Sequence, residues 1–437
     1  MSVPPPLTSA TTPFVPDDES GPRAHTAVPH RVLGFLAVLY VGQFIGLGFL
    51  NAAATVLRSR GVALEDLAIL QAIGIVWGIK FLWGPIVDRV GFGRLGHYRG
   101  WLILMQSAMV LSLLGLMAIT SPETSISLVA ALVLAFSVAA STQDIAADAL
   151  AARLLRAGRR GLANGIQQAG GYLGTLIGGG LTVLVYDAFG WSVALGFIAA
   201  LTAIPLVVAV CFREPATGTS EERSSYGSLL TLVRQPGAAL WIFVAMPLLF
   251  VGATSLAYAL VGPALIDTGA RPGQVALTTT VFAAIPAILV SLATGWAIGV
   301  FGRIRVAAVG IVLVSTALLT LMPLFASGVG SIWSFIAYGA YAALQTIIGT
   351  VIYTVSMDYS RAASAGSDVT FSMAPATVLS MAAAAGGLYA AASVGYAAVA
   401  WVAIAMTVAG GALVLLHLRR YEPYLIAQAN RAAIAAS

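Results

Sequence analysis

The stretch GPIVDRVGFGR, residues 84–94, joins two apolar stretches at about residues 67–87 and 101–119. It contains three glycines and three charged residues. Each flanking stretch has about the 20 apolar residues that a helix needs to cross a bilayer. A polar, glycine-containing segment between two such stretches is typical of the loop of a helical hairpin in a membrane. The stretch therefore predicts a membrane-spanning helix on either side of it.

The whole chain has the composition of a membrane protein. Of its 437 residues, 59% are hydrophobic and 9% are charged, whereas soluble domains carry roughly 25% charged residues. From Val32 onward, twelve apolar stretches predict an all-α membrane protein with twelve transmembrane helices in two six-helix halves. The stretches are centred on about residues 32–57, 67–87, 101–119, 126–151, 162–185, 191–212, 238–265, 274–299, 306–326, 331–357, 368–392 and 394–418.

Basic residues predict the orientation of these helices. With the amino terminus in the cytoplasm, every Lys and Arg lies on the cytoplasmic side except Arg58, Arg60, Arg271 and the intramembrane Lys80. This asymmetry agrees with the positive-inside rule. It predicts cytoplasmic amino and carboxyl termini and a multi-pass protein of the bacterial inner membrane.

A polar loop divides the twelve stretches into six and six. GPIVDRVGFGR has a weaker counterpart, GWAIGVFGRIR, after the eighth stretch, and a 6+6 repeat is typical of secondary transporters with a central site. The predicted domains are a disordered cytoplasmic tail at 1–30, an N-terminal half at 31–212, a cytoplasmic linker at 213–237, a C-terminal half at 238–418 and a cytoplasmic tail at 419–437.

The sequence lacks the residues that several classes of protein function require. A single cysteine, Cys211, and four histidines in tails or at helix ends argue against a disulfide framework and a metal site. No nucleophile with a base partner stands within the apolar stretches, so we do not expect an enzyme. Topology explains the basic excess, so we expect no nucleic-acid partner. Glycines at 170–180 without a following GK[ST] predict helix packing and not a phosphate loop.

Charged residues lie inside two of the predicted spans. Lys80 lies about 12 Å inside the end of the second span, and Asp144 lies at nearly the same depth in the fourth. An unpaired charge there costs at least about 2.5–3.5 kcal/mol, so these residues are candidates for function. Asp148 lies one turn from Asp144, and together with Ser137 and Ser141 they form one polar stripe that requires a water-filled cavity.

The roles of these charges stay open at this point. In one interpretation, Asp144 binds the coupled proton, with Lys80 as its counter-ion and Asp148 in the same stripe. In another, Lys80 and Asp144 form a fixed ion pair that orders the N-terminal half without titrating. Direct contact with the solute is a third. Asp148, and Asp358 at the end of the tenth span, lie nearer the interface, and for them a gate or a helix-end ion pair with neighbouring arginines is the favoured role.

Gly84, Asp88, Arg89 and Gly91 resemble the G-x-x-x-D-R-x-G loop motif of the major facilitator superfamily, with Arg94 two positions later than the family's next arginine. This resemblance implies the major facilitator fold. A narrower set of motifs is similar to the branch that contains the AmpG muropeptide permeases, the acetyl-CoA transporters and the rhizobactin, pyochelin and yersiniabactin siderophore importers. These motifs are KFLWGP, RGWLILMQ, TQDIAADA and MDYSRAASAGSDVTF.

The resemblance also implies a central cavity, because spans 1, 4, 7 and 10 line one in the superfamily. Aromatic rings and amides on those faces suit a large, partly apolar organic solute. For each single residue, helix packing explains the side chain equally well. The expected cavity residues are Tyr40, Gln43, Asn51, Gln143, Gln167, Tyr258, Tyr338, Tyr341 and Gln345.

A cytoplasmic gate follows from the same resemblance. Asp88 and the loop arginines are expected to form a charge cluster that breaks when the halves rotate. Asp368 follows Ala365 and Gly366 at the start of the eleventh span, so helix capping explains it without a role in transport. The resemblance of its AGSDVTF segment to the family keeps it as a gate candidate. The expected gate residues are Gly84, Asp88, Arg89, Gly91, Arg94, Asp358 and Arg361.

The sequence favours a proton-coupled secondary transporter that imports a siderophore or metal-siderophore complex, because its twelve-span length resembles the siderophore importers. A muropeptide or glycopeptide permease of cell-wall recycling is the alternative, and an efflux carrier of the same fold is a third. The expected partners are a small organic solute and the lipid bilayer. We expect a monomer without a cofactor, driven by the proton gradient.

Overall fold

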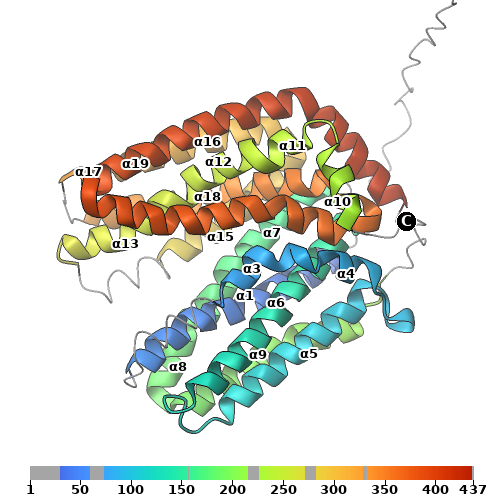
Figure 1. The fold of residues 1–437 in the computed structure, drawn as a ribbon, viewed down its shortest axis with the longest axis vertical. Helices are drawn as coiled ribbons and strands as arrows, with labels where there is room; N and C mark the ends of the chain where they lie inside the picture. The colour runs from blue at the N-terminus through green and yellow to red at the C-terminus, as the bar shows by residue number, and fades with distance from the viewer. Residues whose placement is uncertain are drawn as a thin grey trace, which may run out of the picture.

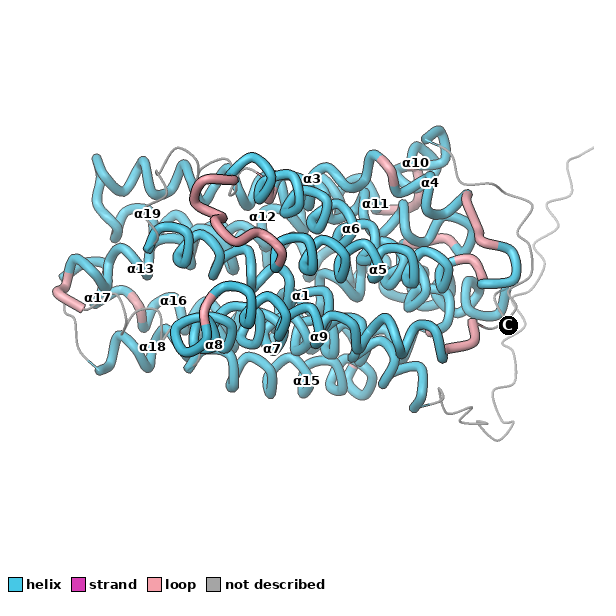
Figure 2. Tube along the Cα trace, turned by 90° about the horizontal axis from the view of Figure 1, so that it is seen from below, coloured by secondary structure: helices cyan, strands magenta, loops and turns pink. Residues whose placement is uncertain are grey.

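The computed structural model describes residues 30–59, 73–155, 157–214, 226–270, 282–327 and 332–435. Almost all of these residues are helical and none of them forms a strand (Figure 2). Figure 1 shows two groups of helices, one from each half of the chain, with α7 and α15 at the boundary between them. The predicted all-α fold is confirmed.

The first group holds the described residues of predicted spans 1 to 6. Spans 2 and 5 are built from more than one helical segment. The elements are α1 (His30–Ser59), α3 (Ile75–Ile79), the 3₁₀ helix η1 (Lys80–Leu82), α4 (Gly84–Arg89), the 3₁₀ helix η2 (Gly93–Leu95), α5 (Tyr98–Met117), α6 (Ile126–Leu154), α7 (Ala157–Thr175), the π-helix η3 (Leu176–Leu181), α8 (Thr182–Phe189) and α9 (Trp191–Cys211).

The second group holds spans 7 to 12 behind a short helix from the linker. The elements are α10 (Tyr226–Val233), α11 (Ala238–Leu240), the π-helix η4 (Trp241–Ala245), α12 (Met246–Phe250), the π-helix η5 (Val251–Leu256), α13 (Ala257–Asp267), α15 (Ala283–Phe301), α16 (Arg303–Thr320), α17 (Met322–Ser327), α18 (Ile332–Tyr359), the 3₁₀ helix η7 (Ala362–Ser364) and α19 (Ala365–Ala435).

Nine helical runs in the described part of the chain are long and apolar enough to cross a membrane. One of them, Ala365–Asn430, contains both predicted spans 11 and 12, which meet at Gly395. Much of the predicted 1–30 tail, and residues within 60–72 and 271–281, lie outside the described residues. The protein is therefore a multi-pass membrane protein, and the count of twelve spans stays a prediction.

Single glycines make three of the tight turns between long helices. Gly190 lies between α8 and α9, Gly302 between α15 and α16, and Gly395 within α19. Each has a φ of 81° or 82°, a left-handed conformation that a Cβ atom disfavours. These turns reverse the chain with almost no loop, so successive helices pack as antiparallel neighbours.

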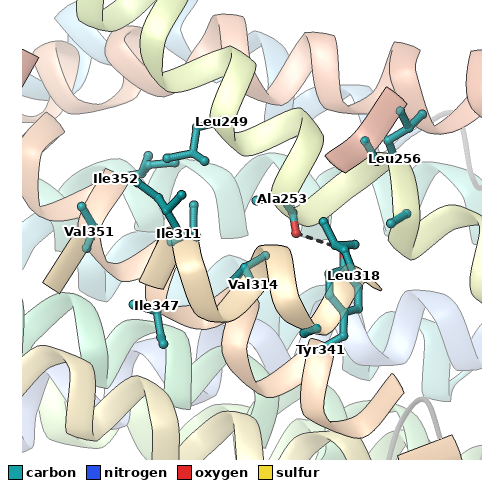
Figure 3. Packing of buried hydrophobic residues seen from close by; sticks show 14 of the residues in the cluster. Leu249, Ala253, Leu256, Ile311, Val314, Leu318, Tyr341, Ile347, Val351 and Ile352 are labelled. Carbon is teal, nitrogen blue, oxygen red and sulfur yellow. Dashed lines mark hydrogen bonds between the residues drawn. The ribbon is translucent and has the colours of Figure 1, made fainter. Parts of the chain in front are cut away.

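Apolar side chains from several helices fill the interior of the second half. Leu249, Leu256, Val314 and Ile352 belong to one buried cluster there, and Leu249 lies beside Ile352 (Figure 3). The Tyr341 hydroxyl lies in the same core and donates a hydrogen bond of 3.0 Å to the Ala253 carbonyl, which satisfies its buried polar group. A smaller cluster lies within the first half, and another joins first-half residues to Met357, Ala365 and Val369 of the second half.

Glycines in α7 and η3 bring that helix against α1. A Cβ atom on Gly174 would lie 2.5 Å from the Val41 carbonyl oxygen, and one on Gly178 would lie 1.8 Å from the Ile45 carbonyl oxygen. The predicted role of these glycines in helix packing is confirmed. At the boundary between the halves, a Cβ on Gly165 of α7 would lie 2.5 Å from the Ser291 carbonyl oxygen of α15.

One capping arrangement occurs in both halves. Glu214, after α9, accepts hydrogen bonds from the backbone nitrogens of Tyr98 and Arg99 at 3.3 and 2.9 Å. Glu422, in α19, accepts one from the backbone nitrogen of Arg303 at 2.9 Å. A carboxylate that follows the sixth or twelfth span therefore caps the amino end of the third or ninth, where the helix dipole favours negative charge.

Replacing Gly174 by alanine should lower the thermal stability of the protein in detergent. The new methyl group meets backbone atoms of α1, which cannot move independently of the helix, and overpacking of this kind costs about 1–3 kcal/mol. Gly180→Ala is the matched control, because a Cβ there has Leu176 Cδ1 as its nearest contact at 3.8 Å. Equal melting temperatures for the two variants would contradict this account of the packing.

Candidate functional site

A cavity of about 130 Å³ lies between the two groups of helices. It is lined by α1, α3, η1, α6 and α7 of the first half and by α18 and α19 of the second. The lining residues are Phe44, Trp77, Lys80, Asp144, Asp148, Gln167, Gln168, Tyr353, Val369, Thr370, Met373, Ala374 and Thr377. The three charges predicted inside the spans thus reach one cavity.

Lys80 reaches the cavity from a break in the second span. The chain leaves α3, forms the 3₁₀ turn η1, and begins α4 at Gly84. Pro85 explains the break, because its ring removes a backbone donor and clashes with the preceding turn of an α-helix. The indole of Trp83 donates a 3.0 Å hydrogen bond to Thr142 Oγ1 of α6, which holds the broken segment against the fourth span.

Lys80 and Asp144 form an ion pair in the cavity wall. The ammonium bonds Asp144 Oδ2, and Gln43 Nε2 donates to Asp144 Oδ1 at 2.5 Å. The side chains are 13% and 7% exposed, respectively. The Lys80 nitrogen also lies 5.2 Å from the centre of the Trp77 ring, a geometry that attracts a cation to an aromatic face.

Asp148 has different partners from those expected. Its Oδ1 accepts a 3.1 Å hydrogen bond from the Tyr40 hydroxyl and a 2.9 Å bond from Gln167 Nε2. The expectation of an arginine partner is wrong for Asp148 within the described residues, because the carboxylate points into the cavity beside Asp144 and not toward the helix end. Tyr40 and Gln167 therefore belong to the cavity through Asp148.

Several buried oxygen atoms near the two aspartates make no hydrogen bond within the described residues. Gln43 Oε1, Gln167 Oε1 and Thr370 Oγ1 have no hydrogen-bond partner in the described part of the structure. Gln43, Gln167 and Thr370 are at most 3% exposed. Because a buried polar atom without a partner is costly, these atoms indicate a site that water, a proton or a solute completes.

Other expected cavity residues lie elsewhere. Gln143 is fully buried and donates to the Leu39 carbonyl at 3.4 Å, so it packs α6 against α1. Tyr338 and Tyr341 lie in the core of the second half, and Gln345 lies on the same helix. The Tyr258 ring is tilted against that of Tyr338, with 6.2 Å between the ring centres. None of these lines the cavity. Asn51 lies on α1, and its side chain is outside the described part.

Several residues of the second half line the cavity and were not predicted to do so, among them Tyr353, Thr370, Met373 and Thr377. Tyr353 lies two helical turns beyond Gln345 on α18, and it lines the cavity. Thr370, Met373 and Thr377 recur at helical spacing on α19 and form one face of the eleventh span. That span was not among those the family resemblance assigned to the cavity.

Asp88 caps a helix of the other half. Its carboxylate accepts from the backbone nitrogens of Gly366 and Ser367 at 3.1 and 2.7 Å, and from Ser367 Oγ at 2.5 Å. The Tyr98 hydroxyl donates to it at 2.7 Å. These amides open α19, so a negative charge there also satisfies the helix dipole. Gly84 permits the approach, because its Cβ would lie 3.1 Å from Ser367 Cα.

Two expectations about this end of the molecule are therefore wrong. Arg89 and Arg94 are exposed, and Asp88 bonds to α19 and Tyr98, not to these arginines, among the residues described. Asp368 does not cap its own helix, because Asp88 occupies that position. The Asp368 carboxylate instead binds Arg361, with NH2 to Oδ1 at 2.7 Å and the backbone nitrogen to Oδ2 at 3.0 Å.

A second contact between the halves is built on Arg160 of α7. Its fully buried guanidinium donates to the Ala152 carbonyl at 2.7 Å and to the Met357 carbonyl at 2.5 Å, so it joins the ends of α6 and α18. It also lies 3.5 Å from Asp358, whose other oxygen bonds Arg303 Nε at 2.5 Å. The expected arginine partners of Asp358 are present, and Arg160 was missed as a gate residue.

Replacing Asp88 by asparagine should open the end of the protein that carries residues 84–94. Asparagine keeps the shape but loses the charge, and a hydrogen bond to a charged group contributes about 1.5–3 kcal/mol. Spin labels at the exposed Arg94 and Arg420, in a Cys211→Ser background, should report longer distances. Tyr98→Phe removes a bond within the first half and is the control. An unchanged distance distribution would refute the capping role.

Known proteins share this fold and part of this sequence. Residues 33–262 match the family model of the Major Facilitator Superfamily. Among solved structures, the transporter FucP in its outward conformation is 14% identical with a TM-score of 0.68, covering 89% of this chain and 98% of that one. A bacterial homologue of the iron transporter ferroportin is 13% identical with a TM-score of 0.67, covering 90% of this chain and all of that one.

The relatives by sequence fall in the AmpG-like branch that the motifs predict. The anhydromuropeptide permease of Escherichia coli (strain K12) is 31% identical over 189 residues, which are 43% of this chain and 37% of that protein. Putative transporter AmpG 3 of Rickettsia typhi is 24% identical over 211 residues, 46% of this chain and 50% of that one. The matches thus span at most half of either relative. The motif, the two-group helical fold and the family match together show that the chain belongs to the Major Facilitator Superfamily.

Proposed function

We propose that this membrane transporter couples proton movement to the import of a cell-wall muropeptide or a related glycopeptide by alternating access. The observation that carries the proposal is the cavity between the two halves, with Lys80, Asp144 and Asp148 in its wall. A charge inside a membrane protein is costly unless it is paired or hydrated, so such residues mark ion and substrate pathways.

The surroundings of Asp144 and Asp148 support proton coupling. Each carboxylate accepts a hydrogen bond from a glutamine amide, Gln43 or Gln167, whose carbonyl oxygen is without a partner in the described residues. A glutamine amide has both donors and an acceptor. Rotation of the Gln167 amide would let it accept from a protonated Asp148, and the Gln43 amide keeps its bond to Asp144 Oδ1 when the other oxygen of Asp144 is protonated. Both protonation states therefore have hydrogen-bond partners at this site.

The substrate class rests on the sequence relatives. They include an anhydromuropeptide permease and a putative transporter AmpG 3. Import of a siderophore complex, which the twelve-span length favoured, has no support among these relatives. A muropeptide carries sugar, peptide and carboxylate groups, and the cavity offers aromatic rings, hydroxyls, amides and a cation for them.

The proposed arrangement in the membrane keeps the predicted topology. Residues 31–212 and 238–418 form the two moving halves, and 213–237 form a cytoplasmic linker between them. The contacts of Asp88 and Arg160 then close the cytoplasmic side in this conformation. Their breakage, together with closure at the opposite end, would expose the cavity to the cytoplasm.

Asp144→Asn should abolish accumulation driven by a pH gradient in proteoliposomes while leaving counterflow exchange of the solute. Asparagine preserves the shape of the cavity but cannot carry the proton. Uptake of radiolabelled anhydromuropeptide, with an imposed gradient and then in exchange mode, measures both activities. Normal gradient-driven accumulation by this variant would exclude Asp144 as the proton site.

A fixed, non-titrating ion pair gives a different pattern. Removal of one partner then leaves a costly lone charge, whereas the neutral variant Lys80→Met with Asp144→Asn restores folding and full gradient-driven transport. If Asp144 carries the proton, this double variant folds but does not accumulate solute against a gradient.

Purified protein should gain thermal stability from anhydromuropeptides and not from ferric siderophores. A ligand that binds only the folded state raises the free energy of unfolding, and therefore the melting temperature, by mass action. At a ligand concentration of 100 times Kd, the free energy of unfolding rises by about 2.7 kcal/mol. Free metal ions serve as controls for the siderophore complexes. A rise in melting temperature with a ferric siderophore alone would overturn the proposed substrate class. It would instead support siderophore import, which the twelve-span length favoured.

A further inference from the structure

The lining of the cavity is chemically asymmetric between the halves. Its charged groups come from the first half, on η1 and α6. The second half contributes Tyr353 from α18 and an apolar and hydroxyl face from α19 that includes Thr370, Met373 and Thr377. An occupant would therefore meet ionic groups on one side and a mostly uncharged wall on the other.

Lys80 is the cation of this lining among the described residues. Its ammonium is held between the Trp77 ring, at 5.2 Å, and the Asp144 carboxylate. The broken second span fixes its position. Because this buried cation is paired with a carboxylate, its availability to another anion depends on whether that carboxylate stays bound to it.

Gln43 and Lys80 bind different oxygens of Asp144, so Gln43 can hold the side chain in place when Lys80 leaves it. Its amide holds Asp144 Oδ1, whereas Lys80 binds Oδ2. A proton on Oδ2 would remove the charge that attracts Lys80, while the bond from Gln43 to the other oxygen persists. The acid would stay in place and the ammonium would lose its partner.

We propose that Lys80 is the specificity-determining residue of the cavity, and that it binds a carboxylate of the transported solute in exchange for Asp144. The exchange rests on the proposed proton-coupled transport. A proton adds to Asp144 Oδ2, the ionic hydrogen bond from Lys80 to that oxygen breaks, and the ammonium forms a new one with the solute carboxylate. One proton and one anion enter together, so the net charge of the cavity is unchanged.

This neutrality is the physical advantage of the exchange. In a medium of low dielectric constant, adding a lone charge is expensive, whereas replacing one carboxylate of an ion pair by another is not. The other ionisable groups that face the pair are Asp148 of α6, Tyr40 of α1 and Tyr353 of α18. Asp148 also disfavours an anion on its side, which leaves Lys80 as the anchor.

The rest of the solute would lie along α19. Thr370 Oγ1 lines the cavity there, and it is 3% exposed and without a hydrogen-bond partner in the described ranges. Met373 and Thr377 follow it on the same face. The site therefore selects a solute with a carboxylate at one end and an uncharged, partly polar body.

Acetate tests the anion site without knowledge of the natural solute. In Asp144→Asn the ammonium has lost its counter-ion, so acetate should raise the melting temperature of this variant by roughly 5 °C at saturation. Acetamide, which has the same shape without the charge, should have no effect. The matched control is Lys80→Met with Asp144→Asn, which keeps the asparagine at position 144 but lacks the ammonium, and it should not respond to acetate.

The second measurement uses a solute of the proposed class. Wild-type protein should bind an anhydromuramyl tripeptide at least tenfold more tightly than its fully amidated counterpart. Its affinity for the acid should rise about tenfold for each unit of falling pH while Asp144 is ionised, because one proton enters with each carboxylate. In Asp144→Asn the affinity for the acid should be high and independent of pH over that range.

The outcomes separate this inference from the proposed function. An equal response of the two variants to acetate, or no response of Asp144→Asn, would overturn the anion site. So would equal binding of acid and amide forms by the wild type. An acetate response that requires Lys80, together with uptake that ignores the pH gradient, would reject proton coupling and keep Lys80 as the anion site.

Discussion

An isolated charge is strongly disfavoured inside a bilayer, and the pairing of Lys80 with Asp144 is how this protein meets that constraint. Residues around the pair hold its two side chains in position. Pro85 breaks the second span so that the lysine reaches the cavity, Trp83 ties the broken segment to α6, and Gln43 orients the carboxylate. The geometry is specific because three helices must hold their registers at once.

The same helix connects the cavity with the contact that closes the protein. α19 begins at Ala365, its first amides bind Asp88 of the other half, and one turn later Val369 and Thr370 form the cavity wall. A rotation of α19 that breaks the cap would therefore also move the wall. Arg160 adds a second buried contact, between α7 and the end of α18, which carries Tyr353. Closure and site are thus mechanically linked through α18 and α19.

The pairing of Lys80 with Asp144 could be predicted from the sequence, but most of the residues around this pair could not. The depth of Lys80 and Asp144 along two apolar stretches was enough to predict their pairing, because rise per residue is fixed in a helix. The partners of Asp148 were not predictable, since Tyr40 and Gln167 lie on other helices whose rotation the sequence does not specify. Tyr338 and Tyr341 face the core of the second half for the same reason, and Tyr353 was missed.

The sequence by itself determined the helical class, the membrane environment, the family and the presence of buried charge, because hydropathy, helix periodicity and the loop motif are local properties of the chain. Only the tertiary structure decided which groups meet. Asp88 binds the amino end of a helix almost 280 residues further along the chain, and Asp144 and Asp148 share one cavity with α19. Such contacts depend on how helices rotate and pack against one another, which is set by close approach at glycines and by burial over the whole molecule.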